Sequence, residues 1–426
     1  MSGIRAVGIV NQALGRSTDS CFPWTGTVSV TLAVFFTLAA PTVVCAASPQ
    51  SDQEIGTVRQ IYDGTLYPDI QVNTFRNIDR LFPTRTVEHG EHIYPLEKSD
   101  TPLEGVEFIS AGKKYDLYDY LSLNRVSGLL VLKNGKIACE RYELGNNEST
   151  RWMSMSIVKS ISSTLVGVAI HDGYIKSIDD PVTKYLPTLA GSAYDGVSVR
   201  NLLQMASGVK WDETYTNPAS DRRRMLEAQL AGKPGSILEL MRTLPRVGKP
   251  GTVWNYNTGE TFVVGELIHA AVKRPVAQYL SERIWSKFGM ESDATWWLES
   301  PDGQEIGGSG LSATLRDYGR FGLFFMNGGV VGKEKLLPEN WTSEATSIKI
   351  ISSKKVDYGY MWWVADAAAN HIHRGAFYAS GIFGQSIYIN PRENVVVVVW
   401  SARPKPTGSD TINDEDFFAA VVKALH

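Results

Sequence analysis

Two short apolar-rich runs lie on either side of a strong turn signal in the first third of the chain. Residues 128–132 and 137–142 flank the dipeptide Asn134-Gly135. This dipeptide is typical of a two-residue β-hairpin turn, because both turn positions require a positive φ angle. The pattern therefore predicts two antiparallel strands that are joined by a tight turn.

A second pair of strand-like runs lies near the C-terminus. Residues 385–390 and 394–401 flank a turn that we place at residues 391–393. Residues 395–399 are all valine, and a continuous β-branched run is typical of a strand that is buried on both faces. A second antiparallel pair is therefore expected at this end of the chain.

Helical periodicity dominates the stretch between these hairpins. Residues 156–172 carry Ile157, Ile161 and Leu165 at helical spacing, and Gly173 follows as a typical helix terminator. Similar patterns predict helices over residues 198–208, 237–242, 261–272, 276–288 and 315–327. The middle of the chain is therefore expected to be mainly α-helical.

These elements predict an α/β (α+β) fold. We expect an antiparallel sheet that is built from both ends of the chain, is flanked by helices and carries an inserted helical lobe at about residues 174–340. The catalytic domain is expected over residues 111–426 and an N-terminal arm over residues 47–110. Within the arm, residues 75–87 could form an amphipathic helix that ends at Pro83.

The first 46 residues are typical of a targeting segment. Arg5 and Arg16 precede an apolar stretch, residues 28–44, which ends at Cys45-Ala46 with small residues where a signal peptidase cleaves. The segment is interpreted as a signal peptide or as a membrane anchor. Either predicts an exported protein, periplasmic or secreted, with membrane attachment only through this segment.

Charge and cysteine content exclude several classes of protein. The net charge of the whole chain is −3, and removal of residues 1–46 (Arg5, Arg16 and Asp19, net +1) makes it −4. This mild acidity argues against a nucleic-acid partner, and we expect the run of three arginines at residues 222–224 to be a solvated helix face. Without residues 1–46, Cys139 is the single cysteine, so neither an internal disulfide nor a cysteine-rich metal site can form.

The predicted helix at residues 156–172 begins with a Ser-x-x-Lys pattern, Ser156 to Lys159. This spacing places the two side chains on one helix face, where an amine can take the proton of a serine hydroxyl and make it nucleophilic. Ser110 and Ser352 also begin such a pattern, but both lie in stretches that are typical of turns. The pattern alone favours an ordinary helix-capping serine.

Two further stretches could supply chemistry. Tyr256 lies in a turn, residues 250–258, just before a predicted helix, and it could either move a proton or anchor the turn by packing. Ala379, Ser380 and Gly381 precede the late strands, where small side chains would let a ligand approach the strand edge. A packing role is equally compatible with this triplet.

The order of these three elements resembles that of the serine β-lactamase and penicillin-binding protein family, which has Ser-x-x-Lys, then Tyr-x-Asn or Tyr-x-Ser, then a Lys-Thr-Gly-like triplet. The connecting sequence is also similar, with RNLLQMASG at residues 200–208. The likeness is strongest to the class C-like branch that includes 6-aminohexanoate-dimer hydrolase and related esterases. It depends on YGYMWWV at residues 358–364 and FYASGIFGQSIYINP at residues 377–391.

The resemblance implies a role for each motif. Ser156 would be the nucleophile, Lys159 its base partner and Tyr256 the group that relays a proton to the leaving atom. The backbone N–H groups of Ser156 and Ile382 would form the oxyanion hole. The substrate-binding positions implied by the same motifs are Thr258, Ala379, Ser380 and Gly381.

Two departures from the family pattern bear on the substrate. Thr258 replaces the usual Asn or Ser, and Ala379 replaces the lysine that commonly binds a substrate carboxylate. A charge-assisted hydrogen bond contributes roughly 1.5–3 kcal/mol, so carboxylate substrates should be disfavoured unless Arg374 substitutes for the lysine. We therefore expect a hydrolase of linear amides or esters, with weak or no hydrolysis of β-lactam antibiotics.

Other functions stay open at this point. A D,D-carboxypeptidase, a β-lactamase or a non-hydrolytic penicillin-binding-like sensor would share the same motifs. No Gly-x-Ser-x-Gly elbow or His-Glu-x-x-His helix is present, so neither a cofactor nor a catalytic metal is expected, and the partner is a small amide or ester. The tryptophan pairs at residues 296–297 and 362–363 could line an acyl pocket or belong to the core.

Overall fold

The computed structural model describes residues 53–365 and 371–426, which belong to one compact unit. The expected targeting segment, residues 1–46, lies outside the described residues, so its prediction stays untested. Within the described ranges, no helix is both long and apolar enough to cross a membrane.

A six-stranded antiparallel sheet joins the two ends of the chain, in the order β13-β14-β15-β16-β4-β5. Its C-terminal strand β16 pairs with the early strand β4, with Val397 opposite Val131. Both predicted hairpins are confirmed, and Asn134 and Gly135 adopt the positive φ angles (53° and 76°) that their turn requires. The strands are β4 (Val126–Lys133), β5 (Lys136–Tyr142), β13 (Trp363–Val364), β14 (Phe377–Gly381), β15 (Gln385–Asn390) and β16 (Val395–Ser401).

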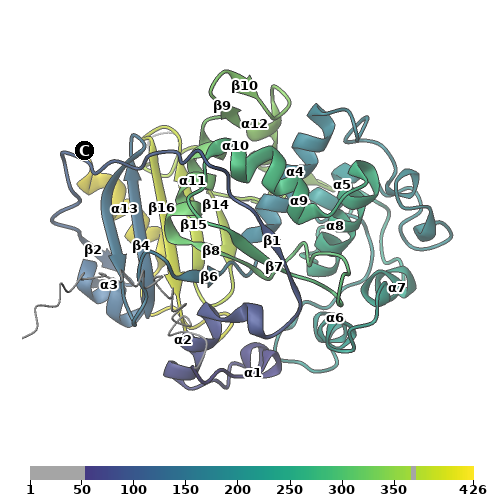
Figure 1. The fold of residues 1–426 in the computed structure, drawn as a ribbon, viewed down its shortest axis with the longest axis horizontal. Coiled ribbons are helices and arrows are strands. Elements are labelled where there is room, and N and C mark those ends of the chain that lie inside the picture. Colours follow the sequence, from purple (N-terminus) through teal and green to yellow (C-terminus); the bar gives the residue numbers. More distant parts are fainter. Residues whose placement is uncertain (1–52, 366–370) are drawn as a thin grey trace, which may run out of the picture. The chain divides into compact units, whose positions relative to one another are not determined.

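Helices cover both faces of this sheet (Figure 1), which explains the continuous valine run. Val397 belongs to a core cluster that includes residues of α3 (Leu117–Leu123) and α13 (Asp414–Ala424). The neighbouring Val396 belongs to the other cluster, which contains residues of α4 (Ile157–His171) and α11 (Leu315–Met326). Because alternate side chains point to opposite faces, every position of the strand must be apolar.

The middle of the chain is mainly helical, as predicted. Its helices are α4 (Ile157–His171), α5 (Val199–Leu203), α6 (Asp221–Leu230), α7 (Ser236–Thr243), α8 (Thr258–Val272), α9 (Val276–Leu280), α10 (Ser286–Phe288) and α11 (Leu315–Met326). Ser198 caps α5 by accepting a hydrogen bond from the backbone of Asn201. A π-helical turn, Ser281–Trp285, joins α9 to α10.

A second antiparallel sheet was not predicted from the sequence. Four short strands form it in the order β1-β7-β8-β6. They are β1 (Thr84–Val87), β7 (Ala294–Trp297), β8 (Leu311–Thr314) and β6 (Arg151–Met153). Strands of three or four residues carry little periodicity, so their pairing depends on the packing of distant segments.

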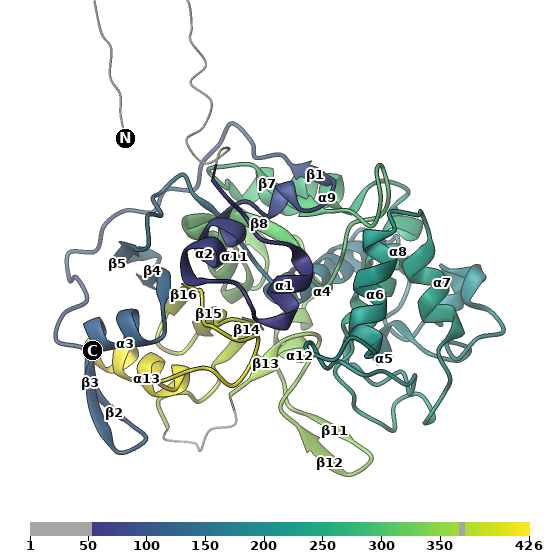
Figure 2. The ribbon, with the colours of Figure 1, turned by 90° about the horizontal axis from the view of Figure 1, so that it is seen from below.

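The predicted helix over residues 75–87 is wrong. The arm instead contains two earlier helices, α1 (Val58–Asp63) and α2 (Pro68–Arg76), and residues 84–87 form strand β1. Pro68 favours the first turn of a helix because it has no N–H to satisfy there, and Asn77 is the C-cap residue of α2. Figure 2 shows α1 and α2, in purple, between the six-stranded sheet and the helices α6 to α8.

The expectation that residues 222–224 form a solvated helix face is also wrong for two of the three arginines. Arg222 and Arg223 on α6 are each 4% exposed, and only Arg224 points to solvent. The two buried side chains contact α1 of the arm, which the sequence pattern of α6 could not reveal.

Candidate active site

Ser156 immediately precedes the first residue of α4, where this helix begins beside the end of strand β14. The residue before it, Met155, has a φ of 42°, a backbone conformation that is unfavourable for a side chain of this size. This turn presents the serine at the positive end of a 15-residue helix. Ser156 lines a cavity of about 340 Å³.

Lys159 lies one helical turn after Ser156, as the spacing predicted. Its Nζ atom lies 2.8 Å from Ser156 Oγ and donates a second hydrogen bond to the backbone oxygen of Gly308, also at 2.8 Å. The side chain is buried, and this burial lowers the pKa of Lys159 to about 7. A large fraction of the amine is therefore neutral near neutral pH, as a proton acceptor requires.

Tyr256 completes a group of three side chains with Ser156 and Lys159. The Lys159 nitrogen lies 5.3 Å from the centre of the Tyr256 ring, and Tyr256 lines the same cavity as Ser156. Burial raises the pKa of the Tyr256 phenol, so the hydroxyl stays protonated at neutral pH. The ring is held by Trp363, which stacks on it at a centroid distance of 5.7 Å.

The end of strand β14 forms another side of the cavity. Ser380, Gly381 and Ile382 line the cavity together with Ser156. A Cβ atom at Gly381 would lie only 3.0 Å from the backbone nitrogen of Ser156 and 2.7 Å from Ser154 O, so glycine allows this close approach. The backbone of Ile382 is thereby positioned near that of Ser156.

Two of the predicted substrate-binding residues are not at the cavity. Ala379 is buried in the main core cluster and is absent from the cavity lining. Thr258 is also buried, and its hydroxyl donates to a carboxylate oxygen of Glu213 at 2.5 Å. That hydroxyl is already satisfied within the protein, whereas Ser380 and Gly381 lie where a ligand can reach them.

Glu213 is a residue that the sequence motifs did not identify. Its carboxylate accepts hydrogen bonds from the backbone and side chain of Thr258 and from the indole of Trp211, so it satisfies the N–H group of the first residue of α8. Its negative charge raises the pKa of both Lys159 and Tyr256. No spacing or periodicity singles out one acidic residue in this loop, so the sequence offered no signal for it.

Tyr215 and Arg403, which the sequence did not single out, also line the cavity, as does Trp363, which was considered for an acyl pocket. Of the four tryptophans considered, only Trp363 lies there; the other three are at most 1% exposed in the core. Arg403 is the single cation among the lining residues, and Asp414 holds it at 2.5 Å. Arg374, the suggested replacement for the missing lysine, is not among these residues.

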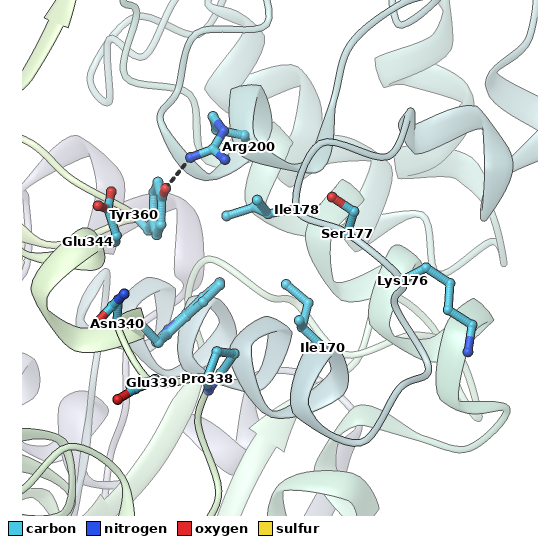
Figure 3. Close-up of a pocket in the computed structure, with 11 residues that line it drawn as sticks. Ile170, Lys176, Ser177, Ile178, Arg200, Pro338, Glu339, Asn340, Glu344 and Tyr360 are labelled. Carbon is cyan, nitrogen blue, oxygen red and sulfur yellow. Dashed lines mark hydrogen bonds between the residues drawn. The ribbon is translucent and has the colours of Figure 1, made fainter.

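A larger cavity of about 560 Å³ lies elsewhere, at the C-terminal end of α4 beside α12 (Trp341–Ala345). Figure 3 shows its lining, in which Arg200 donates a hydrogen bond to the Tyr360 hydroxyl at 2.5 Å. Its one serine, Ser177, accepts a backbone hydrogen bond and has no amine partner among the described residues. The smaller cavity is therefore the candidate active site.

Potential metal ligands are dispersed in the described part of the chain. Among these residues, no three His, Cys, Asp or Glu side chains are grouped so that they could hold a metal ion. His373 shares a 2.8 Å hydrogen bond with Tyr388, and His89 lies 2.5 Å from Asp293.

The chain is similar to known proteins over most of its length. The profile of the β-lactamase family matches residues 125–420. The 6-aminohexanoate-dimer hydrolase of Paenarthrobacter ureafaciens is 29% identical over 347 residues, which cover 78% of this chain and 85% of that protein.

Solved structures share the fold at lower sequence identity. One from Bacillus anthracis, named provisionally as a 6-aminohexanoate-dimer hydrolase, has a TM-score of 0.74 and 21% identity, and the match covers 87% of this chain and 98% of that one. A penicillin-binding protein from Bacillus halodurans has a TM-score of 0.55 and 18% identity, with coverage of 73% and 100%. The predicted fold class is confirmed by these similarities.

Proposed function

This chain belongs to the β-lactamase family and is a hydrolytic serine enzyme, and from this premise we propose that it cleaves a linear amide or ester through a covalent acyl-enzyme on Ser156. The observation that carries the proposal is the 2.8 Å distance between Ser156 Oγ and Lys159 Nζ at the wall of an open cavity. The similarity to a 6-aminohexanoate-dimer hydrolase supports a linear amide as the substrate class.

The proposed reaction has two steps. Neutral Lys159 accepts the hydroxyl proton while Ser156 Oγ attacks the carbonyl carbon, and the negative charge on the carbonyl oxygen faces the backbone N–H groups of Ser156 and Ile382. The Tyr256 phenol gives its proton to the leaving nitrogen or oxygen and recovers one from Lys159. Water then attacks the acyl carbon, and the carboxylic acid leaves as Ser156 regains its proton.

Hydrolysis of β-lactams or of peptides that end in D-alanine is the less favoured alternative. Ala379 offers no cation for a substrate carboxylate, and Arg403, the one cation that lines the cavity among the described residues, already pairs with Asp414. A guanidinium that is already paired must give up that ion pair to bind another anion. The gain in binding free energy from a substrate carboxylate is therefore small. Efficient turnover of nitrocefin or benzylpenicillin would contradict this preference.

The decisive experiment compares the wild-type protein with Ser156→Ala on p-nitrophenyl esters and on a linear dimer of 6-aminohexanoate. The proposal expects repeated product release by the wild type and loss of at least about 10³-fold in kcat for the variant. A fluorophosphonate should label the wild type on Ser156 and should leave Ser156→Ala unlabelled. Labelling without turnover of any ester or amide would instead identify a non-hydrolytic sensor.

Export is part of the same proposal. It is supported by the sequence pattern of residues 1–46, which places two arginines before an apolar stretch and small residues after it. Mass spectrometry of the protein isolated from its native host should find a mature N-terminus near residue 47 if the segment is cleaved. Full-length protein in the membrane fraction would support the anchor instead, and full-length protein in the soluble cytoplasmic fraction would exclude both.

A further inference from the structure

The N-terminal arm contacts one wall of the catalytic cavity through a stacked pair of tyrosines. Tyr62 on α1 is 1% exposed, and its ring lies 6.3 Å from the ring of Tyr215 with only 13° between the two planes. Tyr215 in turn lines the cavity. The next residue of the arm, Asp63, forms a 2.5 Å ion pair with Arg223, whose same nitrogen donates to the backbone oxygen of Tyr215 at 3.1 Å.

Tyr62 also holds the other buried arginine of α6. The Arg222 guanidinium lies 4.3 Å from the centre of the Tyr62 ring and donates a hydrogen bond to its hydroxyl. Arg222 forms no ion pair among the described residues. The aromatic ring and hydroxyl of Tyr62 are therefore the main groups that offset the desolvation of its buried charge. The arm therefore stabilises a positive charge beside the cavity.

The same arm contacts the opposite wall. In the turn after α1, the backbone oxygen of Gly64 accepts a 2.8 Å hydrogen bond from Lys405, and on α2 the Gln71 amide donates to the backbone oxygen of Arg403 at 2.8 Å. Arg403 and Pro406 line the cavity on this side. Gly64 has a φ of 60°, and a Cβ there would lie 3.3 Å from Pro404 O. The turn after α1 and the segment at Pro404 are therefore in close contact.

We propose that the arm is a positioning element of the catalytic site, in which Tyr62 fixes the ring of Tyr215 and the turn at Gly64 sets the separation of the two cavity walls. The arm lies outside residues 125–420, the part of the chain that matches the family profile. This inference rests on the proposed function and adds a substrate preference to it. The arm affects KM most for substrates whose chains extend past the scissile bond and contact both walls.

A matched control lies on the same short helix. Arg59 forms a 2.6 Å ion pair with Glu227 of α6, but both side chains are about half exposed and neither lines the cavity. Arg59→Ala therefore weakens the attachment of α1 without touching Tyr215. Tyr62→Ala removes both the stacked ring and the hydroxyl, whereas Tyr62→Phe removes the hydroxyl alone.

The test measures hydrolysis of p-nitrophenyl acetate and of p-nitrophenyl octanoate by the wild type and each variant. The Tm of each variant checks that it is folded. Tyr62→Ala should raise KM for the octanoate by about two- to tenfold, the range that the loss of one aromatic pair supports, and leave kcat for the acetate within about twofold. Arg59→Ala and Tyr62→Phe should keep the wild-type ratio of the two KM values. A Tyr62→Ala effect that is equal for both esters, or is absent, would overturn the proposal.

A double-mutant cycle tests whether Tyr62 acts through Tyr215. In a Tyr215→Ala background, Tyr62→Ala should change the octanoate KM by less than about twofold, because the ring that it positions is gone. An undiminished effect in that background would refute the positioning role. If Tyr62→Ala does not fold, Tyr62→Leu takes its place in the same cycle.

Hydrogen exchange separates this inference from the proposed function, because it does not depend on turnover. Peptides that span residues 211–217 should exchange faster in Tyr62→Ala than in the wild type and should be unchanged in Arg59→Ala. If the wild type hydrolyses no ester or amide, the proposed function fails while the exchange data still decide the role of the arm. Unchanged exchange in Tyr62→Ala would refute that role.

Discussion

The side-chain nitrogen of Lys159 lies 2.8 Å from the hydroxyl of Ser156, and burial lowers the pKa of Lys159 to about 7. An amine with an ordinary pKa near 10.5 would be almost fully protonated at neutral pH and could not accept the serine proton. Burial of Lys159 thus allows its amine to act as the base that activates Ser156 as a nucleophile.

The first prediction concerns the pH dependence of the reaction. Because the neutral form of Lys159 is the base, kcat/KM for an ester should rise with pH and reach half of its plateau near pH 7. Lys159→Met should lower kcat by about 10³-fold or more. A profile that is flat between pH 5 and pH 9, or a Lys159→Met variant with substantial activity, would remove Lys159 from the mechanism.

Two charges near the site should move that midpoint in opposite directions. The negative charge of Glu213 raises the pKa of Lys159 and the positive charge of Arg222 lowers it. Glu213→Gln should therefore shift the midpoint of kcat/KM to lower pH and Arg222→Met to higher pH, each by about half a unit to one unit. Shifts in the same direction would show that the variants act through structural disturbance, which the Tm of each variant checks independently.

Tyr256→Phe should separate substrates by their leaving group. An amide nitrogen must be protonated to leave, whereas p-nitrophenolate leaves as an anion. The variant should therefore lose about 10²-fold or more in kcat on a linear amide and less than about tenfold on a p-nitrophenyl ester. Equal losses on the two substrates would mean that Tyr256 does not protonate the leaving group.

The stability of the fold should depend on pH through Glu260, a buried residue in the first turn of α8. Ser207 donates a hydrogen bond to one of its carboxylate oxygens, the other has no hydrogen-bond partner among the described residues, and burial raises the pKa to about 8. Because the unfolded pKa is near 4.5, the stability that the neutral carboxyl contributes is lost as pH rises from about 4.5 through 8.

Glu260→Gln keeps the shape of the side chain and removes this titration. The variant should differ little from the wild type at pH 5 and should be more stable at pH 9, by at least about 1 kcal/mol in the free energy of unfolding. Urea denaturation at the two pH values measures the difference. A stability gain that is the same at both values would indicate that Glu260 is not neutral in the folded protein at pH 5.

The elements that depend on local pattern could be read from the sequence. The hairpin at Asn134-Gly135, the valine strand β16 and the helix α4 all formed where periodicity and turn chemistry predicted them. The three motif residues, Ser156, Lys159 and Tyr256, also meet as their order suggested. Each of these features is encoded within a window of a few residues or in the order of the motifs along the chain.

The tertiary structure alone decided the electrostatics and the boundaries of the site. Lys159 acquires its lowered pKa because distant segments bury it, and Glu213 and Arg222 act on it from loops and helices that no periodicity marks as functional. The two arginines expected in solvent are buried because α1 covers them. Sequence determined which groups could react; burial and charge at the site depend on contacts between residues far apart in the chain, which no local pattern records.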